Sequence, residues 1–337
     1  MVREYYPGRN NYLIYAEETS YGSGGTPGVS NNFGRVQNVS LEMSNNFVVS
    51  QGIGEGANAT SVVLGRFSVS GSLTTEPVDF TFLQYGIGQR SGAGTSGDPY
   101  LLEELDVHGY SSNQLPSLNM ELGSKALSNH QVKQVTGTVF NSWSLEGEQG
   151  SSLSCNMAFK GRTVNRSTSI ETFTALSGLP VVFNSGSCSW NSETLSVRRF
   201  SVSCDYPSSN PQEVFDRFDK QPIKGQRRYR FTLTMDMHFD NGASIVSSNE
   251  LLDEFFYASD APDDTGAPTG RDLVINITEG GASGDRDITI QLENAFIESW
   301  SETPAQGDDF VPITVTGIAL AGKDETGTKV PVKWFTN

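Results

Sequence analysis

Residues 65–76 read GRFSVSGSLTTE, and residues 225–236 read GQRRYRFTLTMD in the same frame. Each stretch begins with a glycine, continues as an alternating strand, and ends in Leu-Thr, one further residue and an acid. Alternation with a period of two predicts a β-strand that buries one face and exposes the other. In the first strand we expect Phe67, Val69 and Leu73 to point into a core. The return of this strand in the second half of the sequence predicts that the chain contains one unit twice.

Four other segments recur in the same order and at nearly the same spacing as this strand. They are a preceding alternating strand, a short apolar-alternating strand, a Ser-Trp-Ser motif and a closing strand. Their positions are Val39–Asn46 and Phe200–Pro207, Leu118–Met120 and Ile275–Ile277, Ser142–Ser144 and Ser299–Ser301, and Leu153–Gly161 and Ile313–Gly322. Trp143 and Trp300 are therefore predicted to be equivalent core residues of two modules.

The composition favours β structure with many turns, because 35 of the 337 residues are glycine and only 18% are charged. One short helix is expected in each copy, within residues 76–88 and within residues 247–260. We predict a mainly β fold of two tandem β-sandwich or half-barrel modules, each with one short α-helix, plus long loops and terminal arms. The predicted boundaries are an N-terminal arm (1–32), module 1 (33–161), a connecting segment (162–195), module 2 (196–322) and a C-terminal arm (323–337).

The aromatic residues of the two predicted arms would be exposed on an isolated chain. Tyr5 and Tyr6 lie near one end, and Trp334 and Phe335 near the other. Exposed aromatic clusters on terminal extensions are a liability for a monomer. We therefore expect these four residues to dock onto a neighbouring molecule.

Charge and residue chemistry exclude several functional classes. The net charge of −16, without a Lys/Arg stripe, argues against a nucleic-acid binder. The three cysteines have no metal-site spacing and are predicted to be buried free thiols. We also expect a soluble chain without a signal peptide or membrane span, because no long apolar run is present.

Catalytic and cofactor-binding groups are also not predicted. No Ser, Cys or Asp in a nucleophile motif lies near His108, His130 or His238 in the sequence. Adjacent carboxylates such as Glu103-Glu104 could suit glycoside hydrolysis, but the sequence does not give the distance between candidate carboxylates. The acidic loop stretches lack the ligand spacing of a calcium loop. We predict no enzyme activity, no cofactor and no metal site.

A family resemblance rests on the strand VSLEMS (39–44), the long polar loop after it, the Gly-Arg strand at 65–76 and the hairpin TVFNSWSLEGEQGSSLSCNMAFKG (138–161). Together with the short amphipathic segment, these features resemble major tail tube proteins of long-tailed bacteriophages and archaeal tailed viruses. The resemblance covers 33–161 and 196–322. It implies rings whose inner strands join into one β-barrel and stack into a tube for genome ejection.

The same resemblance implies where the protein acts and what it contacts. The expected location is the virion tail, after assembly in the host cytoplasm. The expected partners are further copies of the chain and other tail proteins such as the tape measure, the terminator and the baseplate or tip. DNA would pass through without specific binding, and no membrane is involved. Two modules per chain predict a trimeric ring with pseudo-sixfold symmetry, with a hexamer as the alternative.

Three sets of residues follow from this interpretation. The outward phase of the strands would face the lumen: Ser40, Glu42, Ser68, Ser70, Ser72, Thr74, Ser201, Ser203, Thr232 and Thr234. The long loops 44–65 and 205–225 would contact adjacent rings through Val49, Gln51, Gly54, Glu55, Glu213, Phe215 and Phe218. Terminal docking would use Tyr5, Tyr6, Trp334 and Phe335.

Two points stay open in the sequence. Arg199, Arg228 and Arg230 share the outward phase, so they pair with Asp205, Asp236 or a neighbouring copy, or the lumen is less acidic than the net charge suggests. A register slip of one residue would also move them. The alternative function, of a different class, is a receptor-binding or surface-decoration β-sandwich protein.

Overall fold

The structure is a computed structural model of the chain. It describes residues 11–28, 31–50, 61–105, 115–125, 130–170, 178–183, 185–206, 208–209, 218, 223–224, 227–237, 248–256, 268–279, 285–304, 310–325 and 328–336. All statements below concern these residues.

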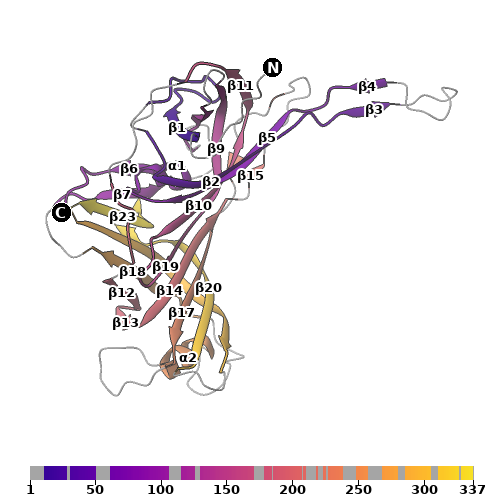
Figure 1. The fold of residues 1–337 in the computed structure, drawn as a ribbon. Coiled ribbons are helices and arrows are strands. Elements are labelled where there is room, and N and C mark those ends of the chain that lie inside the picture. Colours follow the sequence, from indigo (N-terminus) through magenta and orange to yellow (C-terminus); the bar gives the residue numbers. More distant parts are fainter. Residues whose placement is uncertain are drawn as a thin grey trace.

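The chain is mainly β, as predicted (Figure 1). The first half contains β1 (Asn11–Glu17), β2 (Arg35–Ser44), β3 (Val48–Ser50), β4 (Ser61–Val63), β5 (Ser68–Glu76), β6 (Gly88–Ser91), β7 (Tyr100–Glu104), β8 (Leu118–Ser124), β9 (Gln131–Glu148), β10 (Ser154–Gly161) and β11 (Thr163–Ser167). The second half contains β12 (Ser185–Trp190), β13 (Glu193–Leu195), β14 (Val197–Asp205), β15 (Ser208–Ser209), β16 (Ile223–Lys224), β17 (Arg228–Asp236), β18 (Arg271–Thr278), β19 (Arg286–Glu302), β20 (Pro312–Gly322), β21 (Asp324–Glu325), β22 (Thr328–Lys329) and β23 (Val332–Thr336).

The helices are few and short, and they lie in the two predicted windows. The 3-10 helix η2 (Thr81–Leu83) leads into α1 (Gln84–Ile87), and α2 (Ser248–Phe256) lies in the second half. Leu251 on α2 is buried and Phe255 packs against the core. Among the described residues, none of the helices is long and apolar enough to cross a membrane.

Eight antiparallel strands form one continuous ribbon across both halves, in the order β2-β5-β10-β9-β14-β17-β20-β19. In the first half Leu73 lies between Val39 and Met157. In the second half Leu233 lies between Phe200 and Val315. The middle of the ribbon is the β9–β14 pair, in which Ser142–Glu148 run beside Arg199–Asp205. The two halves therefore share one sheet.

The same pairing order, with the same irregularities, occurs in both halves. The β2–β5 register shifts between Val36 and Asn38, and the β14–β17 register shifts at the equivalent place, between Val197 and Arg199. The β10–β9 register shifts at Ala158/Phe159, opposite Ser142 and Phe140. The β20–β19 register shifts opposite Ser299 and Ile297, at the spacing that also separates Trp143 from Trp300. These β-bulges bend the long strands β9 and β19 at matching points.

Both long strands run from the ribbon into a second layer. There β9 pairs with β8 and β11, and β8 pairs with β1. Correspondingly, β19 pairs with β18 and β23, and β18 pairs with β12. The β6–β7 hairpin joins this layer through β23. The core between the layers contains Trp143, Phe140, Phe200 and Phe231, all with an exposed fraction of 1% or less.

Several predicted boundaries are wrong, because sheet pairing extends into segments that the sequence indicates as arms or linkers. Residues 11–17 form β1, which buries Tyr12 to Tyr15 within the predicted N-terminal arm. Strands β11, β12 and β13 lie in the predicted connecting segment, and β23 lies in the predicted C-terminal arm. These strands are short and weakly alternating, so their pairing partners, and not their own pattern, place them in the sheets.

One predicted equivalence is wrong by four positions. The sequence aligns Leu118 with Ile275, but Leu118 pairs with Thr138 on β9 and its structural counterpart Arg271 pairs with Ala295 on β19. A shift by an even number of positions leaves every side chain of a strand on the same face. The apolar alternation therefore could not reveal it.

Candidate assembly surfaces

One face of the ribbon is a layer of small polar side chains. Of the predicted lumen residues, Ser40, Glu42, Ser70 and Ser72 are exposed, and Ser68, Thr74, Ser201, Ser203, Thr232 and Thr234 are half-buried. Hydrogen bonds run across the strands: the hydroxyls of Ser40 and Ser72 share one of 2.8 Å, and Thr74 donates to Asn156 Oδ1 over 2.6 Å. These hydroxyl and amide side chains make this part of the face polar.

Two arginines on this face are paired with glutamates of the long strands β9 and β19, and the third, Arg228, is exposed. Arg199 lies 3.7 Å from Glu146 on β9, and Arg230 lies 3.1 Å from Glu298 on β19. The predicted partners Asp205 and Asp236 are wrong for these two arginines, since Asp236 instead accepts from Arg198 over 2.9 Å. No register slip is involved, because the ribbon register follows the predicted phase. These ion pairs are exposed, so each stabilises the fold little.

A two-stranded hairpin extends β2 and β5 away from the body (Figure 1). Its strands β3 and β4 pair Val48 with Val63 and Val49 with Val62. All the large apolar side chains here are between 57% and 61% exposed: Phe47, Val48, Val49, Val62, Val63 and Leu64. An apolar patch of this kind on a projecting hairpin marks an interaction site. We call residues 47–49 and 61–64 the hairpin arm.

The predicted loop contacts fall partly on this arm. Val49 is on it, whereas Gln51, Gly54, Glu55, Glu213 and Phe215 lie outside the described residues. Phe218 packs edge-on against Phe67 of the same chain, with ring centroids 6.1 Å apart. The sequence indicates a long polar loop, but the valines that flank it carry the exposed apolar surface.

The two ends of the ribbon are open sheet edges. Among the described residues, β2 pairs with β5 alone, and residues 296–302 of β19 pair with β20 alone. Val39 and Leu41 on β2 are half-buried and Met43 is 46% exposed. The residues at the same positions of β14, namely Phe200, Val202 and Cys204, are fully buried, because β9 covers that edge.

The two tryptophans differ in the same way. Trp143 on β9 is buried next to Tyr229, whose ring centroid is 6.4 Å away. Trp300 on β19 packs against the core but remains half-buried, and its Nε1 donates to Glu302 over 2.7 Å. In the sheet pairing, Trp143 lies opposite Met157 and Trp300 opposite Val315.

A buried ionic cluster fixes the second half against the first. Glu104 on β7 accepts from Arg227 Nη1 over 3.2 Å, from Tyr229 Oη over 2.5 Å and from the Gly322 amide over 2.8 Å. Arg227 also donates to Tyr206 Oη over 3.3 Å and to the Leu105 carbonyl. The Arg227 and Glu104 side chains are only 13% and 7% exposed. This cluster joins residues that are 123 apart in the chain, and no local pattern indicates it.

The electrostatics of the cluster keep its tyrosines neutral. Burial, followed by the neighbouring Cys204, raises the pKa values of both Tyr206 and Tyr229 well above the ordinary range. Burial alone would lower the pKa of Arg227, but Tyr206 and Glu104 outweigh it and the net shift is upward. Arg227 is therefore the cation of the cluster, and the phenols act as hydrogen-bond donors or acceptors.

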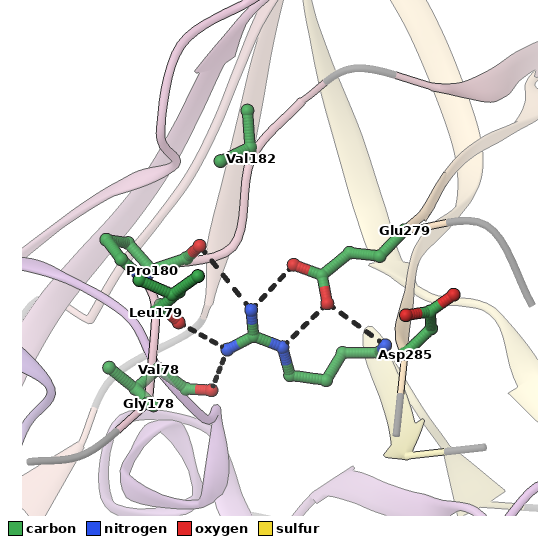
Figure 2. A pocket seen from close by; sticks show the side chains of 8 residues that line it. Val78, Gly178, Leu179, Pro180, Val182, Glu279 and Asp285 are labelled. Atoms are coloured by element: carbon green, nitrogen blue, oxygen red, sulfur yellow. Dashed lines mark hydrogen bonds and ion pairs between the residues drawn. The ribbon is translucent and has the colours of Figure 1, made fainter. Parts of the chain in front are cut away.

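A second tie between the halves is centred on Arg286 (Figure 2). Its guanidinium donates to the carbonyl of Val78, over 2.7 Å, and to those of Leu179 and Pro180, over 2.6 and 3.4 Å. Glu279 receives two further bonds from the same guanidinium, of 2.8 and 2.6 Å. The arginine thus lies in an open cleft of about 720 Å³ with all three nitrogens engaged. Arg286 therefore has a structural role, because it joins the second half to the backbone of residues 78 and 179–180.

The terminal aromatic residues only partly match their prediction. Trp334 is 6% exposed and packs on Tyr100 of the same chain at 5.1 Å, so its predicted docking onto a neighbour is wrong. It is buried because β23 pairs with both β19 and β7. Phe335 lies on the same strand and is half-buried. Tyr5 and Tyr6 lie outside the described residues.

The structure also places the groups that could carry chemistry. All three cysteines, Cys155, Cys188 and Cys204, are buried free thiols, as predicted. Burial raises the pKa of Cys188 and of Cys204 to about 12. Within the described ranges, no group of three or more His, Cys, Asp or Glu residues could hold a metal ion. The surfaces that stand out are sheet edges, a polar sheet face and an apolar hairpin.

A family model described as phage tail tube protein matches residues 8–289, which is most of the chain. A search of curated proteins gives no match.

Proposed function

Because the chain belongs to the family of phage tail tube proteins, we propose that three copies close into a ring and that the rings stack into a conduit for the genome. Membership itself makes the chain a structural protein of the virion tail, which assembles into a tube with other tail proteins. The ring, its stoichiometry and the passage of DNA are the proposal. That the role is structural alone and not enzymatic is likewise part of the proposal.

The observation that carries the proposal is the repeated pairing order. Each half supplies four ribbon strands, with bulges at matching residues. This supports two tandem copies of one tube module, which occupy two successive positions of a ring. Their extent is larger than the sequence predicted, since β1 and β12 begin corresponding sheets.

The width of the conduit favours three chains. Each chain contributes eight ribbon strands, so three chains contribute twenty-four. With strands about 4.8 Å apart and tilted by about 40°, such a barrel is about 50 Å wide between backbones. The eight strands of one chain would close into a barrel filled by its own side chains. Six chains would double the width and leave a lumen far larger than a DNA duplex needs.

The polar face supports its placement toward the lumen. DNA binding by proteins depends on cations that neutralise phosphates and release counterions. Here Arg199 and Arg230 are paired with glutamates, Arg228 is an exposed cation, and many other residues of the face carry hydroxyls. Such a wall holds DNA weakly and lets it slide.

The hairpin arm is the proposed contact between stacked rings. Its apolar surface projects from the first half, and burial of that surface against an adjacent ring would stabilise the stack. Tape measure, terminator and baseplate or tip proteins are the proposed partners at the ends of the tube.

Purified protein tests the assembly directly. Electron micrographs should show rings or tubes, and native mass spectrometry of single rings should give three chain masses. Rings with six chain masses would replace the trimer by the hexamer. A chain that stays monomeric at high concentration, without rings or tubes, would refute the assembly.

Substitution of the hairpin arm tests the stacking separately. Val49→Asp places a charge on the apolar surface without touching the ribbon, so rings should form but tubes should be absent or short in micrographs. Val49→Ile keeps the surface apolar and should give normal tubes. Normal tubes from Val49→Asp would move the stacking contact to another surface.

A further inference from the structure

We infer that β2 of one chain pairs antiparallel with the C-terminal half of β19 of the next copy, in the register that β9 and β14 use within one chain. The inference rests on the proposed ring. It assigns the occupant of both open edges, a second copy of this chain, and the residues that lie opposite one another.

The internal β9–β14 pair is the template for this junction. β9 is the last ribbon strand of the first half and β14 the first of the second half. Their counterparts are β19, the last strand of the ribbon, and β2, the first. β19 therefore has an edge at the place that corresponds to the edge with which β9 pairs with β14.

The register follows from the two bulges. The β9 bulge opposite β10 and the β19 bulge opposite β20 make Ser142 equivalent to Ser299. The irregularities of the β2–β5 and β14–β17 pairs make Val36 equivalent to Val197. Within one chain Ser203 lies opposite Ser144, and Cys204 opposite Trp143. The transferred pairs are Ser44 with Ser299, Met43 with Trp300, Glu42 with Ser301 and Leu41 with Glu302.

The burial pattern shows what each edge lacks. Trp143, Phe200, Val202 and Cys204 are buried by the internal junction. At the open edges, Met43 is 46% exposed and Trp300 is half-buried. Pairing of Met43 with Trp300 would cover both apolar side chains on the core face of the sheet. Unpaired strand edges are otherwise prone to uncontrolled association.

The polar face is equally compatible with the register. Glu42 and Ser44 would lie opposite Ser301 and Ser299, so no like charges meet across the junction. Glu302 replaces the buried Leu145 at the rim of the pair, where it already accepts the Trp300 indole N–H. The contact joins different edges of the two copies, and such head-to-tail contacts generate rings when the rotation closes.

Paired cysteines test the register in the full-length protein. Glu42→Cys with Ser301→Cys should cross-link neighbouring chains when assembled protein is oxidised, with a three-chain product on non-reducing gels. The native thiols are buried and should not interfere. Ser144→Cys with Ser203→Cys reproduces the same geometry inside one chain, so it should oxidise without producing oligomers and calibrates the reaction.

A second variant isolates the register from mere proximity. Glu42→Cys with Ser299→Cys is two residues out of register, and diagonal neighbours are too far apart for an unstrained disulfide. We expect it to cross-link at least about tenfold more slowly than the in-register pair. Equal or faster cross-linking of this variant would overturn the register.

The outcomes separate this inference from the ring itself. Tubes that form normally, with an internal pair that oxidises and an in-register pair that does not, would overturn the inference and leave the tube function standing. A chain without rings or tubes would overturn the proposed function. A cryo-electron microscopy map of the tube gives a second reading, in which Met43 must lie opposite Trp300 of the next copy.

Discussion

Strands β2 and β14 occupy the same position in the two halves, yet one is half-exposed and the other is buried. Val39, Leu41 and Met43 on β2 alternate as Phe200, Val202 and Cys204 do on β14. Only β14 has a second neighbour, since β9 pairs with it along Arg199–Asp205. Because β2 has no second neighbour among the described residues, its apolar side chains stay partly exposed and stabilise an isolated chain little. The difference teaches that burial of this strand depends on the junction and not on the strand itself.

The two tryptophans offer the largest test of this comparison. Trp143→Ala should lower the free energy of unfolding by about 3–5 kcal/mol, because the side chain is fully buried. Trp300→Ala removes a half-buried ring and should affect the dissociated chain much less, while it impairs ring formation. Urea denaturation of dilute, unassembled protein measures the first effect, and native mass spectrometry measures the second. Equal losses of stability would show that Trp300 is already a complete core residue.

The two halves of one chain are also joined by the buried ionic cluster, which the proposed junction between chains lacks. Substitutions in this cluster should have the next largest effect on stability. Arg227→Met leaves Glu104 buried without its cation and should cost about 3 kcal/mol or more. The double variant Glu104→Leu/Arg227→Met removes both charges and should recover much of that loss. Urea denaturation of the two variants measures both. A double variant no more stable than the single one would mean that the hydrogen bonds from Tyr229 and Gly322 to Glu104 contribute more to stability than removal of the buried, unpaired charge recovers.

Chemical labelling compares the two strands at one position. Met43→Cys should react readily with a maleimide in the unassembled chain and be protected in tubes, whereas Cys204 should stay unreactive in both. Cys204 is buried, and its pKa of about 12 keeps it protonated at pH 8. Mass spectrometry of labelled protein before and after assembly gives both rates. Unchanged labelling of Met43→Cys in tubes would show that β2 stays an open edge.

Much of this fold could be predicted from the sequence, because the ribbon strands alternate strictly. The strands predicted at 65–76 and 225–236 lie where their alternation places them, and Val69 and Leu73 are buried. The failures have one cause: β1, β12 and β23 are held by partners remote in sequence. The sequence around Trp334 is typical of a terminal tail, but pairing with β7 buries this residue.

The assembly surfaces were less predictable than the strands. The sequence predicts a long loop at 44–65, but the apolar valines on the hairpin arm appear in sequence as an ordinary strand pattern. The partners of Arg199 and Arg230 could not be found, because Glu146 and Glu298 come from β9 and β19 rather than from the adjacent hairpin strand. Cross-strand neighbours depend on which strands meet, and that information is not local.

The smallest expected effect concerns those arginines. Arg230→Ala and Glu298→Ala should each change the free energy of unfolding by less than about 1 kcal/mol, because both side chains are at least half exposed. Their effect on the conduit should have opposite signs. Without Glu298 the unpaired Arg230 adds a cation to the proposed lumen, so Glu298→Ala tubes should retain DNA fragments more strongly at low salt, whereas Arg230→Ala tubes should retain them less than wild type. A DNA retention assay at two salt concentrations measures this, since a phosphate contact weakens steeply with salt. Equal retention by both variants would place this face of the sheet outside the lumen. The hydroxyl face of β2 and β14 would then not line the DNA path.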